Sequence, residues 1–108
     1  MNANETKKGD NEMQVAKTIL EQLGGRQFIV MTGSKNFVGS ETGLSFKVGR
    51  NSKGITHVRI NLNAMDTYDV EFLKIRKFDP KVAAYREGIY FDQLQSLFTE
   101  ETGLYTRL

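Results

Sequence analysis

Cysteine is absent from the sequence, histidine occurs once, and no long run of apolar residues is present. Without cysteine the chain cannot form disulfides, use a thiol nucleophile or bind a metal through sulfur, and this composition fits a reducing compartment. No apolar run approaches the roughly 20 residues of a membrane-spanning helix, and the polar N-terminal residues lack the apolar segment of a secretory signal. The sequence therefore predicts a cytoplasmic protein with no membrane association.

The same scarcity limits the chemistry available for catalysis. A Ser-His-Asp set would have to use His57, which falls on the polar side of an alternating segment beside Arg59. Three carboxylates that could bind a hard cation lie close together in the sequence: Asp66, Asp69 and Glu71. They lack the spacing of a calcium loop, and Arg59 and Lys74 are simpler partners for cross-strand salt bridges. We therefore predict a non-enzymatic protein with no catalytic residue, no metal site and no cofactor.

The chain of 108 residues is long enough for one domain. Residues 1–11 are almost entirely polar and predict a disordered N-terminal tail, and residues 12–108 predict a single α+β domain. Apolar residues at helical spacing predict a first helix over residues 12–23, ended by Gly24-Gly25, and a last helix over about residues 88–102, ended by Gly103. The apolar stripe of the last helix is Ile89, Tyr90, Leu94, Leu97 and Phe98, and Leu104-Tyr105 are expected to return to the core.

Four segments between these helices predict strands: residues 26–32, 44–48, 55–63 and 68–76. Short connections make neighbouring strands antiparallel. The expected order is therefore α-β-β-β-β-α, with a four-stranded meander that gains a fifth strand if residues 81–85 pair at the edge. After Phe72 the apolar phase moves to Leu73 and Ile75, which indicates either a bulge or a second buried face.

Residues 33–43 predict a long, glycine-rich loop between the first two strands. Loops of this length inside a compact domain are often functional. Lys35, Asn36 and Phe37 are therefore candidate binding residues. The alternative is a surface loop that is held in place by the burial of Phe37.

Positive charge is concentrated in the middle of the chain. Residues 26–81 carry ten basic and five acidic side chains, whereas residues 82–108 carry two basic and four acidic ones. The candidate binding residues for nucleic acid or another partner are Lys47, Arg50, Lys53, His57, Arg59, Lys74, Arg76 and Lys77. Such residues can contact phosphates, or they can form an ordinary solvated sheet face. Most aromatic residues are expected in the core, so no base-reading pattern is visible.

Four segments also support a comparison with a known group of proteins: residues 19–25 (ILEQLGG), 31–37 (MTGSKNF), 62–70 (LNAMDTYDV) and 102–105 (TGLY). Together they resemble a family of small, functionally uncharacterised proteins from bacteriophages, prophages and other mobile elements, over about residues 13–108. The resemblance implies a protein that works in the cytoplasm of a bacterial host. It implies no activity and no functional residue.

Two functions from different classes remain open. The first is a phage or mobile-element accessory protein that binds nucleic acid through a basic sheet face. The second is a protein-binding anti-defence factor, for example an anti-CRISPR, that inhibits a host defence or replication protein. A homodimer formed through an open sheet edge is a further prediction.

Overall fold

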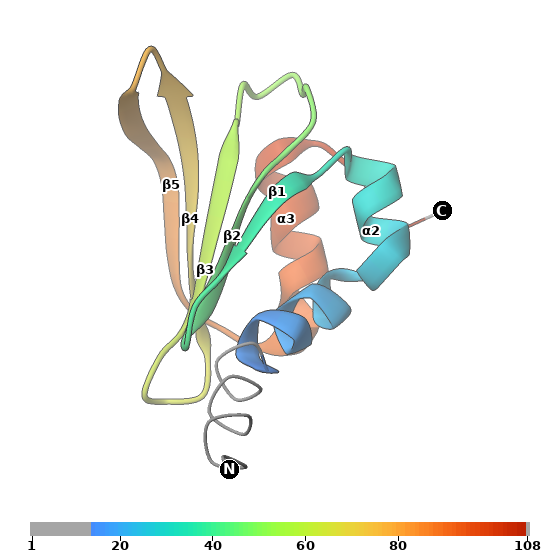
Figure 1. The fold of residues 1–108 in the computed structure, drawn as a ribbon, viewed down its shortest axis with the longest axis vertical. Coiled ribbons are helices and arrows are strands. Elements are labelled where there is room, and N and C mark those ends of the chain that lie inside the picture. The colour runs from blue at the N-terminus through green and yellow to red at the C-terminus, as the bar shows by residue number, and fades with distance from the viewer. Residues whose placement is uncertain (1–13, 108) are drawn as a thin grey trace, which may run out of the picture.

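The computed structural model describes residues 14–107, which form an antiparallel sheet of five strands with helices before and after it in the chain (Figure 1). The strands are β1 (Lys35–Gly39), β2 (Gly43–Lys47), β3 (His57–Leu62), β4 (Tyr68–Arg76) and β5 (Asp79–Ile89). They lie in the sheet in chain order. The predicted α+β meander is therefore confirmed, in its five-stranded form, and the predicted tail over residues 1–11 lies outside the described residues.

Residues 26–32 form a helix, and the prediction of a strand there was wrong. The first helix includes residues 14–23, and α2 (Gly25–Thr32) follows directly after Gly24. Gly24 and Gly25 have φ of 127° and 62°, which lets the chain turn sharply and begin a second helix. Phe28 and Thr32 are buried four residues apart while Val30 is 74% exposed, which is the periodicity of a helix.

Residues 33–43 form a strand and a tight hairpin, so the prediction of a long irregular loop was also wrong. Asn36, at φ 57°, lies where the pairing of β1 with β2 shifts register, which is the geometry of a bulge. The bulge interrupts the alternation by which β1 could have been recognised. The predicted anchoring of Phe37 is confirmed, since its ring lies 5.2 Å from that of Phe46.

The last helix begins later than predicted. β5 runs to Ile89, a short 3₁₀ helix, η1, covers Phe91–Gln93, and α3 covers Leu94–Thr102. Tyr90 is therefore 60% exposed and not part of the helix stripe. Gly103 ends α3 in the left-handed conformation, as predicted, but Tyr105 is 69% exposed and only Leu104 packs on the core.

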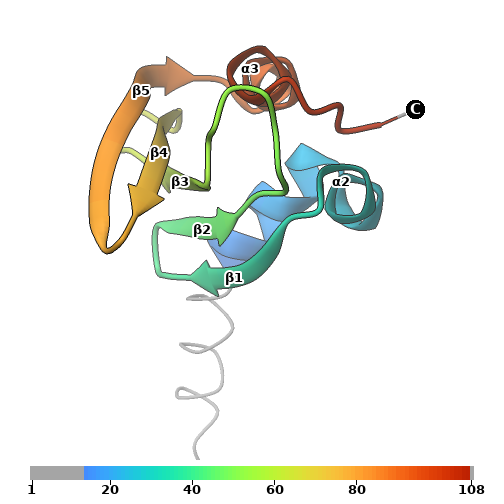
Figure 2. The same ribbon diagram turned by 90° about the horizontal axis from the view of Figure 1, so that it is seen from above.

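All three helices cover one face of the curved sheet, and the core lies between them (Figure 2). Each strand contributes its alternate residues, so that Phe46, Val58 and Phe72 point toward the helices. The ring of Phe28 on α2 packs edge-on against Phe46 and against Phe98 of α3, with distances between ring centroids of 5.6 Å and 5.0 Å. These three aromatic side chains pack α2 and α3 against the sheet.

β4 alternates without a break along its whole length. Its register with β3 pairs Phe72 with Val58 and Leu73 with His57, so Leu73 lies on the face away from the helices. Leu73 is nevertheless only 4% exposed. The predicted second buried face is therefore present on β4. The pairing of β4 with β5 also shifts register between Phe72 and Leu73. The continuous alternation also determines where the basic residues of β4 point.

Candidate nucleic-acid interface

Four basic residues gather where the β4–β5 hairpin meets the β2–β3 loop, and we call them the basic cluster. They are Arg50, Lys74, Arg76 and Lys81. Lys74, Arg76 and Lys81 line one surface hollow together with Asp79, and Arg76 also lines the neighbouring hollow with Arg50. Lys74 and Arg76 reach over Gly54: a Cβ added there would lie 3.7 Å from Lys74 Cε and 3.9 Å from Arg76 Nη2.

The alternation of β4 places these side chains. Phe72 is buried under the helices, and Lys74 and Arg76 follow on the same face of β4 toward the hairpin turn. The turn end of this hairpin extends beyond the helices (Figure 1). The register pairs Lys74 directly with Lys81 and Arg76 with Asp79. A face that is apolar over most of the sheet therefore becomes basic at the end of this hairpin.

Asn51 orders the β2–β3 loop, which carries Arg50 of the basic cluster. Its Nδ2 donates to the carbonyl oxygens of Gly49, at 2.9 Å, and Ile55, at 2.8 Å, and its Oδ1 accepts from the Ile55 N–H at 3.1 Å. These bonds close the β2–β3 loop together with a turn in which the Gly54 N–H donates to the Asn51 carbonyl oxygen at 3.2 Å. Arg50 is thereby presented from an ordered backbone.

No side chain of the basic cluster forms an ion pair within the described part of the chain, although Asp79 lies opposite Arg76 and lines the same hollow. The ion pairs among residues 14–107 are Arg59–Glu71, at 2.9 Å, and Arg86–Glu101, at 2.8 Å, and neither involves the cluster. Like charges directly opposite each other in a sheet are destabilising. The Lys74–Lys81 pair therefore costs stability in the isolated protein, and a bound anion would offset that cost.

Five of the eight predicted residues of the basic sheet face lie outside the basic cluster, and three of these five lie on other surfaces. Arg59 is neutralised by Glu71 on the face away from the helices, which confirms the predicted cross-strand salt bridge. Lys53 Nζ donates to the main-chain oxygen of Glu100 at 3.3 Å and so lies against α3. His57 faces away from the helices, paired with Lys47.

The structure also leaves Lys47 and the candidates from residues 33–43 outside the basic cluster, whereas it places Lys77 beside the cluster. Lys47 borders the hollow of Arg50, but it shares the opposite face with Lys35, its partner across β1 and β2. Lys77 lies in the turn of the β4–β5 hairpin, next to the basic cluster in sequence. Asn36 forms the bulge and Phe37 packs on Phe46, so these two have structural roles.

His57 is held in its neutral form by its surroundings. Partial burial lowers its pKa, and the nearby positive charge of Lys47 lowers it further. Its Nδ1 also lies 2.8 Å from Thr56 Oγ1. At neutral pH this ring therefore adds no positive charge to the sheet.

The lowered pKa of His57 predicts a pH-dependent stability. Because the folded state binds this proton less readily than the unfolded state, the free energy of unfolding should be constant above the ordinary pKa of 6.5 and should fall as the pH drops below it. Urea unfolding between about pH 7.5 and about pH 5.5, where most carboxylates stay ionised, measures this change. The chain has no other histidine. The variant His57→Gln should lose the dependence, and an unchanged slope in that variant would contradict the assignment.

Sequence reasoning missed Lys81 and Phe78. Lys81 begins the segment 81–85, which the sequence predicts as an edge strand only conditionally, and Phe78 falls in none of the predicted strands or helices. Lys77 and Phe78 form a two-residue turn in which both residues have positive φ, although such turns usually contain asparagine, aspartate or glycine. Nothing in the residue types therefore indicated a hairpin at this position.

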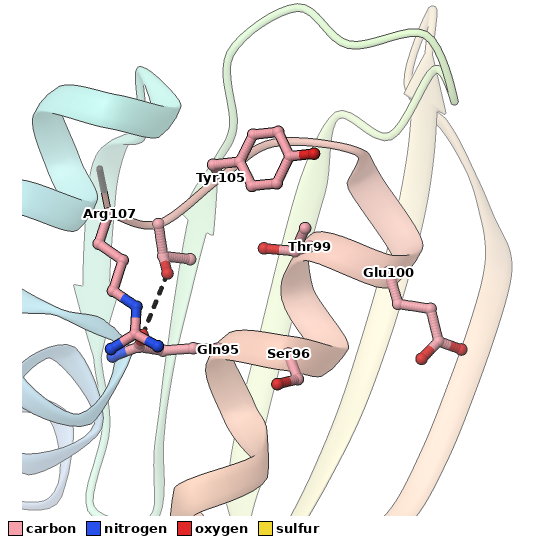
Figure 3. Close-up of a pocket in the computed structure, with 7 residues that line it drawn as sticks. Gln95, Ser96, Thr99, Glu100, Tyr105 and Arg107 are labelled. Atoms are coloured by element: carbon pink, nitrogen blue, oxygen red, sulfur yellow. Dashed lines mark hydrogen bonds between the residues drawn. The ribbon is translucent and has the colours of Figure 1, made fainter.

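A separate surface hollow, of about 570 Å³, lies beside α3 near the C-terminal end of the chain (Figure 3). Its labelled lining residues include Ser96 and Thr99 on α3 and Tyr105 and Arg107 after it. Gln95 accepts a hydrogen bond from Thr106 Oγ1 at 3.1 Å and donates to the main-chain oxygen of Gln22. Two of its polar side chains, Gln95 and Thr106, are thus bonded to each other, and its charged lining residues are one acidic and one basic side chain, Glu100 and Arg107.

Residues 14–107 contain no group of three or more histidine, aspartate or glutamate side chains placed to hold a metal ion. Within this range, no helix is both long enough and apolar enough to cross a membrane.

No protein-family model, curated protein or solved structure matches the chain. The resemblance to phage proteins therefore stays a prediction, and the functional argument depends on the surface itself.

Proposed function

We propose that this protein binds nucleic acid, without catalysis, through phosphate contacts from the basic cluster and Lys77. The observation that carries the proposal is the convergence of Arg50, Lys74, Arg76 and Lys81 around two adjoining hollows, with none of them in an ion pair with another described residue. Lysine and arginine side chains grouped in this way supply most backbone contacts in protein–nucleic acid complexes.

Binding should have the salt dependence of counterion release. Four or five phosphate contacts predict that the logarithm of the association constant falls with the logarithm of salt concentration with a slope of about −4. The measurement is fluorescence anisotropy with labelled duplex DNA, single-stranded DNA and duplex RNA between about 50 and 200 mM salt. An affinity that is undetectable at the lowest salt, or one with no salt dependence, would contradict the proposal.

The second candidate is a protein-binding anti-defence factor in a bacterial host. Exposed apolar side chains favour it: Val82 and Tyr85, on the face of β5 away from the helices, are 55% and 46% exposed. A nuclease-treated capture from host lysate should recover a defence or replication protein in stoichiometric amount. The variant pair Val82→Ser and Tyr85→Ser should abolish that capture and leave salt-dependent DNA binding unchanged.

A homodimer through a sheet edge is a weaker proposal. Both edge strands show register irregularities, in the pairing of β1 with β2 and of β4 with β5. Such irregularities twist an edge away from a flat partner strand and so disfavour further pairing. Light scattering at several protein concentrations measures the oligomeric state directly.

A further inference from the structure

The tip of the β4–β5 hairpin presents one aromatic side chain to solvent. Phe78 is 99% exposed and lies in the two-residue turn with Lys77, at φ of 65° and 51° respectively. Left-handed backbone is unfavourable for a bulky residue, and full exposure recovers none of that cost through burial. In the isolated protein, glycine at position 78 would therefore give a more stable turn than Phe78.

Positive charge surrounds this aromatic tip. Lys77 is its neighbour in the turn, and Arg76, Lys74 and Lys81 follow along one face of the same hairpin. The hairpin is a two-stranded antiparallel ribbon that extends beyond the helices (Figure 1). An apolar end with basic flanks is complementary to a ligand that has phosphates outside and stacked apolar surfaces inside.

We propose that Phe78 is a wedge that enters the minor groove of duplex DNA and inserts between two base pairs, while Lys77 and the basic cluster hold the flanking phosphates. This inference rests on the proposed nucleic-acid binding. Apolar side chains that enter the minor groove unstack a base step and kink the duplex by about 20–90°. Such binding explains why a bulky residue occupies the left-handed backbone of the turn, because the exposed ring then gains contacts that the isolated protein does not give it.

The spacing of exposed aromatic residues favours a duplex over a single strand. Single-strand binding proteins stack successive bases on several aromatic side chains along a groove. Here Phe78 stands alone at the tip, and the exposed Tyr85 lies seven positions away along β5. A-form RNA has a wide, shallow minor groove, which would make few contacts with an inserted side chain. Duplex DNA is therefore the ligand class that fits.

Energy transfer across a short DNA duplex with a dye at each end measures the expected kink. Wild-type protein at about 50 mM salt should increase the transfer, since the ends approach each other when the duplex bends. The variant Phe78→Ala should abolish this increase and weaken binding by about tenfold. The salt slope should stay the same, because the phosphate contacts remain. The matched control is Phe91→Ala, which removes another ring, 60% exposed on η1, and should change neither readout.

Two further variants separate the wedge from an effect on folding. Phe78→Gly suits the positive φ and should preserve or raise the thermal midpoint while it abolishes the kink. Phe78→Trp introduces the only tryptophan in the chain. Its emission should be quenched by duplex DNA through stacking on bases, whereas the control Phe91→Trp should be unaffected.

The outcomes distinguish the two proposals. If wild-type protein binds neither DNA nor RNA, the proposed function itself is wrong, and if it binds RNA alone, only the wedge is wrong. If it binds with the expected salt slope but Phe78→Ala bends DNA as well as wild type, or the introduced indole is not quenched, only the wedge is wrong. Quenching by single-stranded DNA without any bending of the duplex would also overturn the wedge and would favour stacking on unpaired bases.

Discussion

Replacement of Lys74, Arg76 and Lys81 with glutamine is expected to weaken binding to duplex DNA by about 10²- to 10³-fold at about 50 mM salt. The same triple variant should reduce the magnitude of the salt slope by about 3, because each phosphate contact contributes roughly 0.9 to it. The fold should persist, since all three side chains lie beyond the core and none forms an ion pair among the described residues. Stability should even rise slightly when the opposed Lys74–Lys81 charges are removed.

The matched control removes the same amount of charge from other elements. Lys17, Arg26 and Arg107 are exposed and lie on the first helix, on α2 and after α3. Their replacement with glutamine leaves the same net charge as the triple variant of the hairpin. An equal loss of affinity in both triple variants would show that net charge alone drives binding, and it would contradict a defined interface. Thermal unfolding of both variants checks that the comparison is between folded proteins.

Replacement of Phe28 with alanine is expected to lower the free energy of unfolding by about 3–5 kcal/mol. Its ring is fully buried and contacts Phe46 of β2 and Phe98 of α3, so its loss opens a cavity where three elements meet. Domains of this size have about 5–15 kcal/mol of stability in total, so the variant should be close to unfolding at ambient temperature. Urea unfolding followed by circular dichroism measures the change.

Val30→Ala is the control on the same helix. Val30 is 74% exposed, two residues from Phe28, and its truncation should change stability by less than about 0.5 kcal/mol. The pair also tests the structure of residues 25–32, because a strand would place residues 28 and 30 on the same face. Equal losses in the two variants would contradict the helical assignment of α2.

Much of the fold could be predicted from local patterns. Residues 44–48 and 55–63 alternate clearly and residues 68–76 alternate up to Phe72, and the structure has strands at Gly43–Lys47, His57–Leu62 and Tyr68–Arg76. Gly103 ends the last helix where it was expected. These features could be recognised because each depends on a period or an end signal contained within a few neighbouring residues.

Three elements, α2, β1 and β5, were not predicted correctly from local patterns. Residues 26–32 are β-branched and aromatic, yet they form α2, because Phe28 and Thr32 are buried by packing against the sheet and α3. β1 escaped recognition because a bulge at Asn36 disrupts its alternation. β5 was uncertain because most of it is exposed and it contains register irregularities opposite β4. Tertiary packing overrode the local preference in α2, whereas in β1 and β5 a bulge and exposure removed the alternation by which a strand is recognised.

The sequence by itself determined the α+β class, the excess of positive charge in residues 26–81 and the residue types available at any site. Those properties depend on composition and on short-range periodicity, which folding does not alter. Only the tertiary structure decided which charges act together. The register neutralises Arg59 with Glu71, the burial of His57 disfavours its charge, and the extension of β4 beyond the helices joins Lys74 and Arg76 to Lys81 and Arg50. Electrostatic interactions depend on distance in space and on access to solvent, and neither can be read from positions along the chain.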